Sequence, residues 1–160
     1  MVKKQLFWEN VEEGMEIPAL PKTATSQMLV KWAGASGDFN PLHYEFPFAE
    51  AQGVGKPIVH GQLKRAWLMQ MLTDWIGEGG YLRKFSCNFR AVDYPILMKT
   101  LDDPVEKKVT HWCKGKITNK GVKNDEHYIE CEIWVENEQG EKTTPGKAKI
   151  ILPSKVNSRY

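Results

Sequence analysis

The chain has 160 residues, 41% of them hydrophobic, and carries 22 basic against 20 acidic side chains. This length suffices for one sizeable core and is short for two ordinary domains, so we expect a single domain spanning residues 1–160. The formal net charge of +2 provides no general attraction to nucleic acid or acidic membranes, and we expect neither as a partner.

The cysteines Cys87, Cys113 and Cys131 are an odd number without the spacing of a zinc site or a disulfide framework. The N-terminal stretch MVKKQLFWEN lacks the apolar segment of a secretory signal, and no run of about 18 apolar residues occurs. We therefore expect a cytoplasmic protein with reduced thiols and with neither a metal nor a redox cofactor.

The first part of the chain predicts one short helix between two irregular segments. Glycine and proline interrupt the apolar runs of residues 6–25, which indicates an irregular lead-in with at most one short strand. Apolar residues recur at helical spacing from Ser26 to Ala35, which predicts a helix with Ser26 as its N-cap. The polar stretch from Gly37 to Pro41 predicts a loop, because proline disfavours helical backbone in the residue before it.

The strongest helix signal covers Gly61–Ile76. Apolar residues occupy most of its circumference, so this helix is predicted to be largely enclosed, with its tryptophans and methionines in the core. The narrow polar strip that remains consists of Lys64, Arg65, Gln70, Thr73 and Asp74.

The rest of the chain predicts strands. Period-two patterns and turn residues divide it into runs at 81–92, 97–101, 105–118, 127–136 and 147–152. The breaks between them carry Gly121, Asn124, Gly140 and Pro145. Helices followed by consecutive strands indicate an α+β fold with an antiparallel sheet, since no helix remains to make parallel crossovers. The simplest packing wraps that sheet around the helix at 61–76.

A carboxylate and an imidazole lie five residues apart in the segment Ser36–His43, which reads SGDFNPLH. A turn stiffened by Pro41 can bring Asp38 and His43 to one point. Together they can hold a water molecule between a hydrogen-bond acceptor and a group that exchanges a proton. The pair therefore predicts general acid–base addition or removal of water, and the sequence leaves open which residue is the base.

A second candidate feature is the start of the enclosed helix, at Val59-His60-Gly61. The first amides of a helix lack intrahelical acceptors and carry partial positive charge, and glycine lets a ligand approach the backbone closely. The Gly61 N–H is thus suited to a developing oxyanion. We expect His60 to satisfy local hydrogen bonds rather than to take part in the reaction.

The segment SGDFNPLH, with Ala49 six residues on and Ile58-Val59-His60-Gly61 beyond, resembles the MaoC-like, (R)-specific enoyl-CoA hydratase family. The resemblance begins at the lead-in Val11–Met15, and the later strands match it only in pattern. It implies a hot-dog fold, in which an antiparallel sheet wraps one long helix. It also implies a dimer that acts on thioesters of CoA or acyl carrier protein.

The resemblance also implies roles for individual residues. Asp38 and His43 would be the catalytic pair, Asn40 would support the loop at the substrate, and the Gly61 amide would bind the thioester oxygen. Trp32 stands where phenylalanine or tyrosine is usual, and Gln62 stands where methionine is common. The shape of the acyl pocket therefore need not follow the family pattern.

The expected function is a hydratase or dehydratase that interconverts 2-enoyl and 3-hydroxyacyl thioesters. A hot-dog thioesterase and a partner subunit of a heterodimeric dehydratase are the alternatives. A sheet wrapped around one helix leaves open edges, which a second copy could cover, so we expect a homodimer, with a heterodimer as the alternative. His111 and His127 have no partner in the sequence pattern and are expected to be exposed or structural.

Overall fold

The computed structural model describes residues 5–100 and 108–156. Its helical elements are η1 (Trp8–Asn10), α1 (Ser26–Ser36), η2 (Pro41–His43), α2 (Phe46–Ala51) and α3 (Gly61–Ile76). Its strands are β1 (Glu16–Lys22), β2 (Tyr81–Cys87), β3 (His111–Lys123), β4 (Glu126–Asn137) and β5 (Lys142–Ile151). None of the helices in the described ranges has the length and apolar character needed to cross a membrane.

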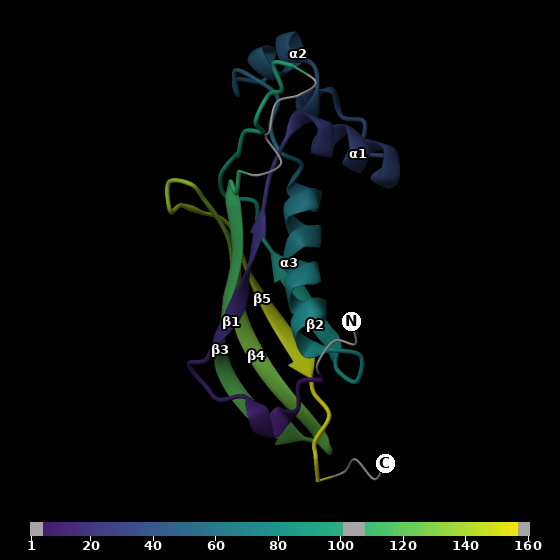
Figure 1. The fold of residues 1–160 in the computed structure, drawn as a ribbon, viewed down its shortest axis with the longest axis vertical. Coiled ribbons are helices and arrows are strands. Elements are labelled where there is room, and N and C mark those ends of the chain that lie inside the picture. The colour runs from purple at the N-terminus through teal and green to yellow at the C-terminus, as the bar shows by residue number, and fades with distance from the viewer. Residues whose placement is uncertain (1–4, 101–107, 157–160) are drawn as a thin grey trace.

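The strands form one antiparallel sheet in the order β1-β3-β4-β5-β2, and this sheet curves around α3 (Figure 1). The predicted α+β architecture, an antiparallel sheet wrapped around one long helix, is therefore confirmed. The edge strands of the described sheet are β1 and β2, because each pairs with one neighbour only.

The helix α3 has the predicted bounds and fills the concave side of the sheet. Leu68, Leu72 and Ile76 are each at most 1% exposed and share one core cluster with Ile117 of β3 and Ile133 of β4. The helix ends at Gly77, whose φ of 76° is in the region that glycine adopts readily. Burial of the apolar side chains between α3 and the sheet is the main stabilising contribution to this arrangement.

Lys64, predicted to lie on the narrow polar strip of α3, is buried. Its side chain is 2% exposed, and its ammonium nitrogen lies 2.7 Å from a carboxylate oxygen of Asp93. Thr143 donates to the same carboxylate at 2.6 Å, and the His111 Nε2 lies 3.6 Å away. Burial opposes the ionisation of Asp93, but the His111 ring and the Lys64 charge outweigh it and hold its pKa below the ordinary value. A buried lysine is thus tolerated because it is paired.

Several predicted element ends are wrong. The strand expected at 81–92 stops at Cys87, which pairs with Gly146. The Asn88 N–H still donates to the Pro145 carbonyl at 2.9 Å, but Pro145 has no N–H to donate in return. Residues 97–100 form no strand, and β3 begins at His111; residues 101 and 105–107 of the predicted strands lie outside the described ranges. The helix α1 begins at Ser26, and its N-cap is Thr25, whose hydroxyl accepts the Met28 N–H at 3.1 Å.

The turn between β3 and β4 also differs from the prediction. β3 runs through Gly121 to Lys123, and Asn124 and Asp125 make a two-residue turn with φ of 51° and 63°. Two positive φ values match the right-handed twist of the strands in a tight hairpin, and Asn and Asp tolerate them better than most residues. The hairpin therefore extends five residues further along β3 than the sequence pattern indicated.

One end of the molecule carries the remaining helices. α1, η2 and α2 gather beside the N-terminus of α3, beyond the end of the sheet (Figure 1). The segment after β2 crosses to this end, where Ile96 pairs with Thr25 and the Asp93 carbonyl accepts the Val59 N–H at 2.8 Å. The loop with Asp38 and His43 is thereby held against the start of α3.

Candidate active site

A series of hydrogen bonds between residues two positions apart shapes the loop that carries Asp38. Gly37 ends α1 with φ of 75°. The Ser36 hydroxyl accepts the Asp38 N–H at 3.2 Å, and the Asp38 carboxylate accepts the Asn40 N–H at 3.4 Å. The Asn40 side chain then accepts the Leu42 N–H at 3.0 Å, which caps η2. Each polar residue of the segment thus fixes the backbone two residues on.

Asn40 makes two further contacts within this loop. Its side-chain oxygen caps η2, and its backbone carbonyl accepts the His43 N–H at 3.1 Å. Both contacts are internal to the loop. The support of the active loop and the substrate contact expected of Asn40 both stay predictions.

His43 is oriented through one of its ring nitrogens. Nδ1 lies 2.8 Å from the Ile58 carbonyl oxygen. A carbonyl only accepts hydrogen bonds, so Nδ1 carries the proton that it donates, and Nε2 holds the lone pair in the neutral ring. His43 can therefore exchange a proton with a ligand only through Nε2.

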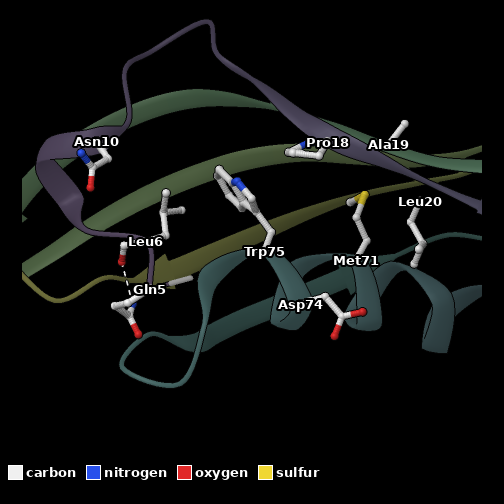
Figure 2. A pocket seen from close by; sticks show the side chains of 9 residues that line it. All are labelled: Gln5, Leu6, Asn10, Pro18, Ala19, Leu20, Met71, Asp74 and Trp75. Atoms are coloured by element: carbon white, nitrogen blue, oxygen red, sulfur yellow. Dashed lines mark hydrogen bonds between the residues drawn. The ribbon is translucent and has the colours of Figure 1, made fainter. Parts of the chain in front are cut away.

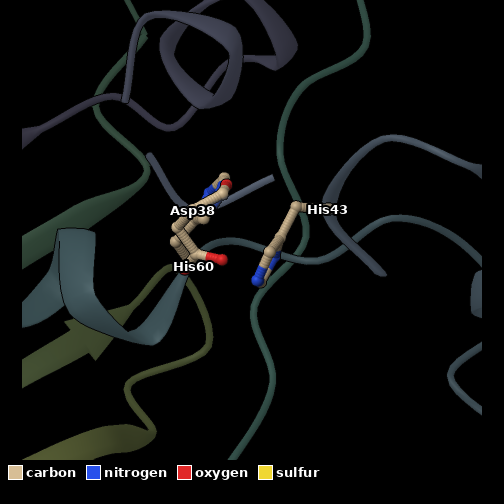
Figure 3. A group of neighbouring side chains, drawn as sticks. All are labelled: Asp38, His43 and His60. Carbon is tan, nitrogen blue, oxygen red and sulfur yellow. The ribbon is translucent and has the colours of Figure 1, made fainter. Parts of the chain in front are cut away.

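His60, which was expected only to satisfy local hydrogen bonds, lies against His43. The two imidazole rings stack with centroids 3.7 Å apart and planes inclined by 20° (Figure 3). His60 is 1% exposed, and its Nε2 lies 3.3 Å from the Asp38 carbonyl oxygen. Burial and the neighbouring His43 ring lower its pKa. A neutral His60 thus contacts both members of the predicted pair.

The structure brings Asp38, His43 and His60 together. One nitrogen or carboxylate oxygen of each lies within 4.8 Å of the corresponding atoms of the other two (Figure 3). A single water can contact two such atoms at that separation, since each hydrogen bond to it spans about 2.8 Å. The stacked imidazoles suit a metal ion poorly, because lone pairs in nearly parallel ring planes do not converge on one point. The arrangement is therefore suited to proton exchange with a bound water.

Gly61 is the first residue of α3, so its N–H has no acceptor within the helix. The Phe89 ring covers this glycine so closely that a Cβ atom there would lie 2.8 Å from the ring. Close packing, rather than an unusual φ, is what requires glycine at this position. The helix start thus presents backbone donors beside His43 and His60.

A cavity of about 490 Å³ opens next to the two histidines. His43 and His60 form part of its wall, and most of the remaining wall is apolar and comes from α1, the Asp38 loop and residues 95 and 97. The two stacked histidines therefore stand at the boundary between the polar cluster with Asp38 and an apolar space.

A second cavity, of about 620 Å³, lies between β1 and the C-terminal half of α3 (Figure 2). Met71 and Trp75 line it from the helix, and Pro18 and Leu20 line it from β1. Ten residues of helix separate Gly61 from Met71, which corresponds to about 15 Å. The larger cavity is therefore remote from Asp38 and His43, and no histidine is among the described residues that line it.

Residues 10–130 match the family model described as a MaoC like domain. A segment of 52 residues is 36% identical to the fatty acid synthase subunit beta of Gibberella zeae. That segment is 32% of this chain and 2% of the relative, so the chain corresponds to a small part of that polypeptide.

Solved structures share the fold over nearly the whole chain. The (R)-hydratase of A. caviae involved in PHA biosynthesis superposes with a TM-score of 0.72 at 22% identity, covering 91% of this chain and 99% of that one. The unliganded R-hydratase PhaJ1 of Pseudomonas aeruginosa gives a TM-score of 0.74 at 20% identity, covering 94% and 88%. Because the family model spans most of the chain and these structures share its hot-dog architecture, the chain belongs to the MaoC-like domain family.

Proposed function

We propose that this protein interconverts 2-enoyl and 3-hydroxyacyl thioesters by adding or removing water. The observation that carries the proposal is the meeting of Asp38 and His43 at the N-terminus of α3, with their polar atoms within 4.8 Å. Membership of the MaoC-like family, and the names of the two hydratases that share the fold, support the same reaction class. CoA and acyl carrier protein are the carriers that we propose.

In the hydration direction, the substrate's thioester carbonyl accepts a hydrogen bond from the Gly61 N–H. That contact draws electron density away from the double bond and makes the β-carbon electrophilic. The partial positive charge of the α3 N-terminus acts in the same direction. A single donor of this kind stabilises the developing oxyanion by about 3 kcal/mol.

The attacking water is held between Asp38 and His43. An ionised carboxylate only accepts hydrogen bonds, so Asp38 orients the water and stabilises positive charge on the imidazole. His43 takes the water proton on Nε2, because its Nδ1 proton is engaged by the Ile58 carbonyl at 2.8 Å. The hydroxyl forms a bond with the β-carbon, and the imidazolium returns a proton to the α-carbon. Dehydration reverses these steps.

We propose that the chain works as a homodimer. The edge strands β1 and β2 each lack a partner on one side within the described sheet. Unpaired edges invite pairing with another chain. Light scattering should give a mass of twice 18.3 kDa, and the mass of one chain would contradict both a homodimer and a heterodimer.

The function is tested by mixing the purified protein with a trans-2-enoyl-CoA and following the absorbance of the conjugated thioester. Loss of absorbance with the thioester bond intact is the expected result. A thiol reagent in a parallel reaction detects free CoA. Release of thiol without hydration would instead identify a thioesterase and would contradict the proposal.

A further inference from the structure

We propose that Asp93 is a positioning residue for the reaction, and that it acts on His43 through the single peptide group between Ile58 and Val59. The Val59 N–H donates to the Asp93 backbone carbonyl at 2.8 Å, and the Ile58 carbonyl oxygen lies 2.8 Å from the His43 Nδ1. The effect on the orientation of His43 does not depend on the substrate, whereas the effect on turnover rests on the proposed function.

The peptide group between Ile58 and Val59 is a rigid connection. The peptide bonds of the described residues are all trans, and in a planar trans peptide the C=O and the N–H point in opposite directions. Asp93 and His43 therefore contact opposite ends of one plane. Donation of the N–H to Asp93 also polarises the carbonyl, which strengthens its hydrogen bond with the imidazole.

The segment 57–60 depends on this contact because it belongs to no helix or strand. The Ile58 N–H donates to the Leu42 carbonyl at 3.3 Å, but Leu42 is part of the same loop as His43. Of the backbone hydrogen bonds of this segment within the described residues, the one to Asp93 reaches outside the loop and α3. A displacement of Asp93 would therefore be passed on to the imidazole.

The Asp93 side chain anchors its own backbone. Its carboxylate contacts Lys64 of α3 at 2.7 Å, Thr143 of β5 at 2.6 Å and the Asn137 side-chain amide of β4 at 3.3 Å. The Lys64 ammonium group also donates to the Ala91 carbonyl at 3.1 Å, two residues before Asp93. The carboxylate is thus held from the helix and from the sheet at the same time.

The burial of Asp93 is the reverse of what hydrophobicity alone favours. Asp93 is 4% exposed, whereas its neighbours Val92 and Tyr94 are 43% and 40% exposed. A buried ion pair gains little net stability over an apolar pair, because both charges lose their hydration. It does provide hydrogen bonds of defined distance and direction, which suit a positioning role.

The test reads the His43 ring directly by nitrogen NMR of the isotope-labelled protein. At a pH of about 8, where an unperturbed histidine is neutral, the wild-type His43 should carry its proton on Nδ1 and none on Nε2. The chain has four histidines, so the loss of one ring from the His43→Ala spectrum assigns the signals. A wild-type ring protonated on Nε2 instead would overturn the proposal.

Asp93→Asn keeps the shape of the side chain but leaves the Lys64 ammonium group buried without a counter-charge. It should convert the His43 ring to a mixture of the two neutral forms. It should also lower kcat for enoyl-CoA hydration on the order of 10²-fold with little change in KM, because the displaced group acts on the reaction and not on substrate binding. Thr143→Val removes one hydrogen bond and no charge, so it should change both readouts in the same direction by less. It keeps the test decisive if Asp93→Asn does not fold.

Two control variants separate positioning from loss of charge and from loss of stability. Asp125→Asn makes the same substitution at the exposed β3–β4 turn, where asparagine tolerates the positive φ. Ile129→Val removes a methylene from the core and lowers stability. Ile129 pairs with Ile150, at the opposite end of β5 from Thr143. Both controls should keep the wild-type ring signals and kcat.

Folded Asp93→Asn and Thr143→Val proteins that keep the wild-type His43 signals would overturn the proposal. An equal change in Ile129→Val would do the same, because it would reduce the effect to general stability. If the wild type hydrates no enoyl-CoA but Asp93→Asn still alters the His43 signals, the positioning of His43 is supported and the proposed function is contradicted. Altered signals with an unchanged kcat would overturn the role of Asp93 in the reaction.

Discussion

The Lys64 ammonium nitrogen lies 2.7 Å from a carboxylate oxygen of Asp93, and both side chains are almost completely buried. Lys64 is one helical turn beyond His60, and the Asp93 backbone carbonyl accepts the Val59 N–H at 2.8 Å. The ion pair therefore joins α3 to the segment that holds the residues immediately before the helix. Stability and the geometry of the candidate site depend on the same contact.

Lys64→Met should lower the free energy of unfolding by about 3–5 kcal/mol, because it leaves the Asp93 carboxylate buried without its cation. Urea denaturation measures this change. Lys31→Met makes the same substitution at an exposed position of α1 and should change stability by less than about 0.5 kcal/mol. If the two variants lose equal stability, the buried pair does not have the structural role assigned to it.

The pH dependence of stability should contain a contribution from His60. Its pKa is lowered below 6.5 in the folded protein, so the unfolded chain binds more protons between the lowered value and 6.5. The free energy of unfolding therefore falls as pH drops below about 6.5. His60→Phe keeps a flat ring that cannot titrate. On acidification, the free energy of unfolding of wild type should fall relative to that of this variant. A difference between the two that stays constant with pH would contradict the burial of a neutral His60.

Gly61→Ala should reduce kcat/KM for enoyl-CoA hydration on the order of 10²-fold, because the new Cβ displaces Phe89 and obstructs approach to the helix amides. Gly34→Ala is the matched control within α1, since a Cβ there meets no atom within 4 Å. It should keep activity and add about 0.5–1 kcal/mol of stability. Full activity in Gly61→Ala would show that the reaction does not use this backbone.

The sequence was sufficient for features that depend on local pattern. The apolar periodicity and the glycine that follows it define α3 from Gly61 to Ile76, and the turn chemistry of Ser36–His43 predicts the loop that brings Asp38 near His43. Each of these depends on residues within a few positions of one another. The spacing of residues along the chain is therefore sufficient to predict α3 and this loop.

Features that depend on distant partners could not be predicted. Lys64 looked like part of a polar strip because Asp93, its partner, is 29 residues away. His60 looked structural because nothing in the sequence reports that its ring stacks on His43. The helix α2, Phe46–Ala51, is too short for periodicity to identify. The burial of Lys64, the stacking of His60 and the formation of α2 all depend on tertiary packing.

The most direct test of the central claim is hydration of a trans-2-enoyl-CoA by wild type, Asp38→Asn and His43→Ala, each checked for folding by circular dichroism. Wild type should hydrate the substrate, and each folded variant should be slower by about 10²–10⁴-fold, the range expected for loss of a general acid–base group. Folded variants that hydrate as fast as wild type would contradict the assignment of Asp38 and His43 as the groups that activate water.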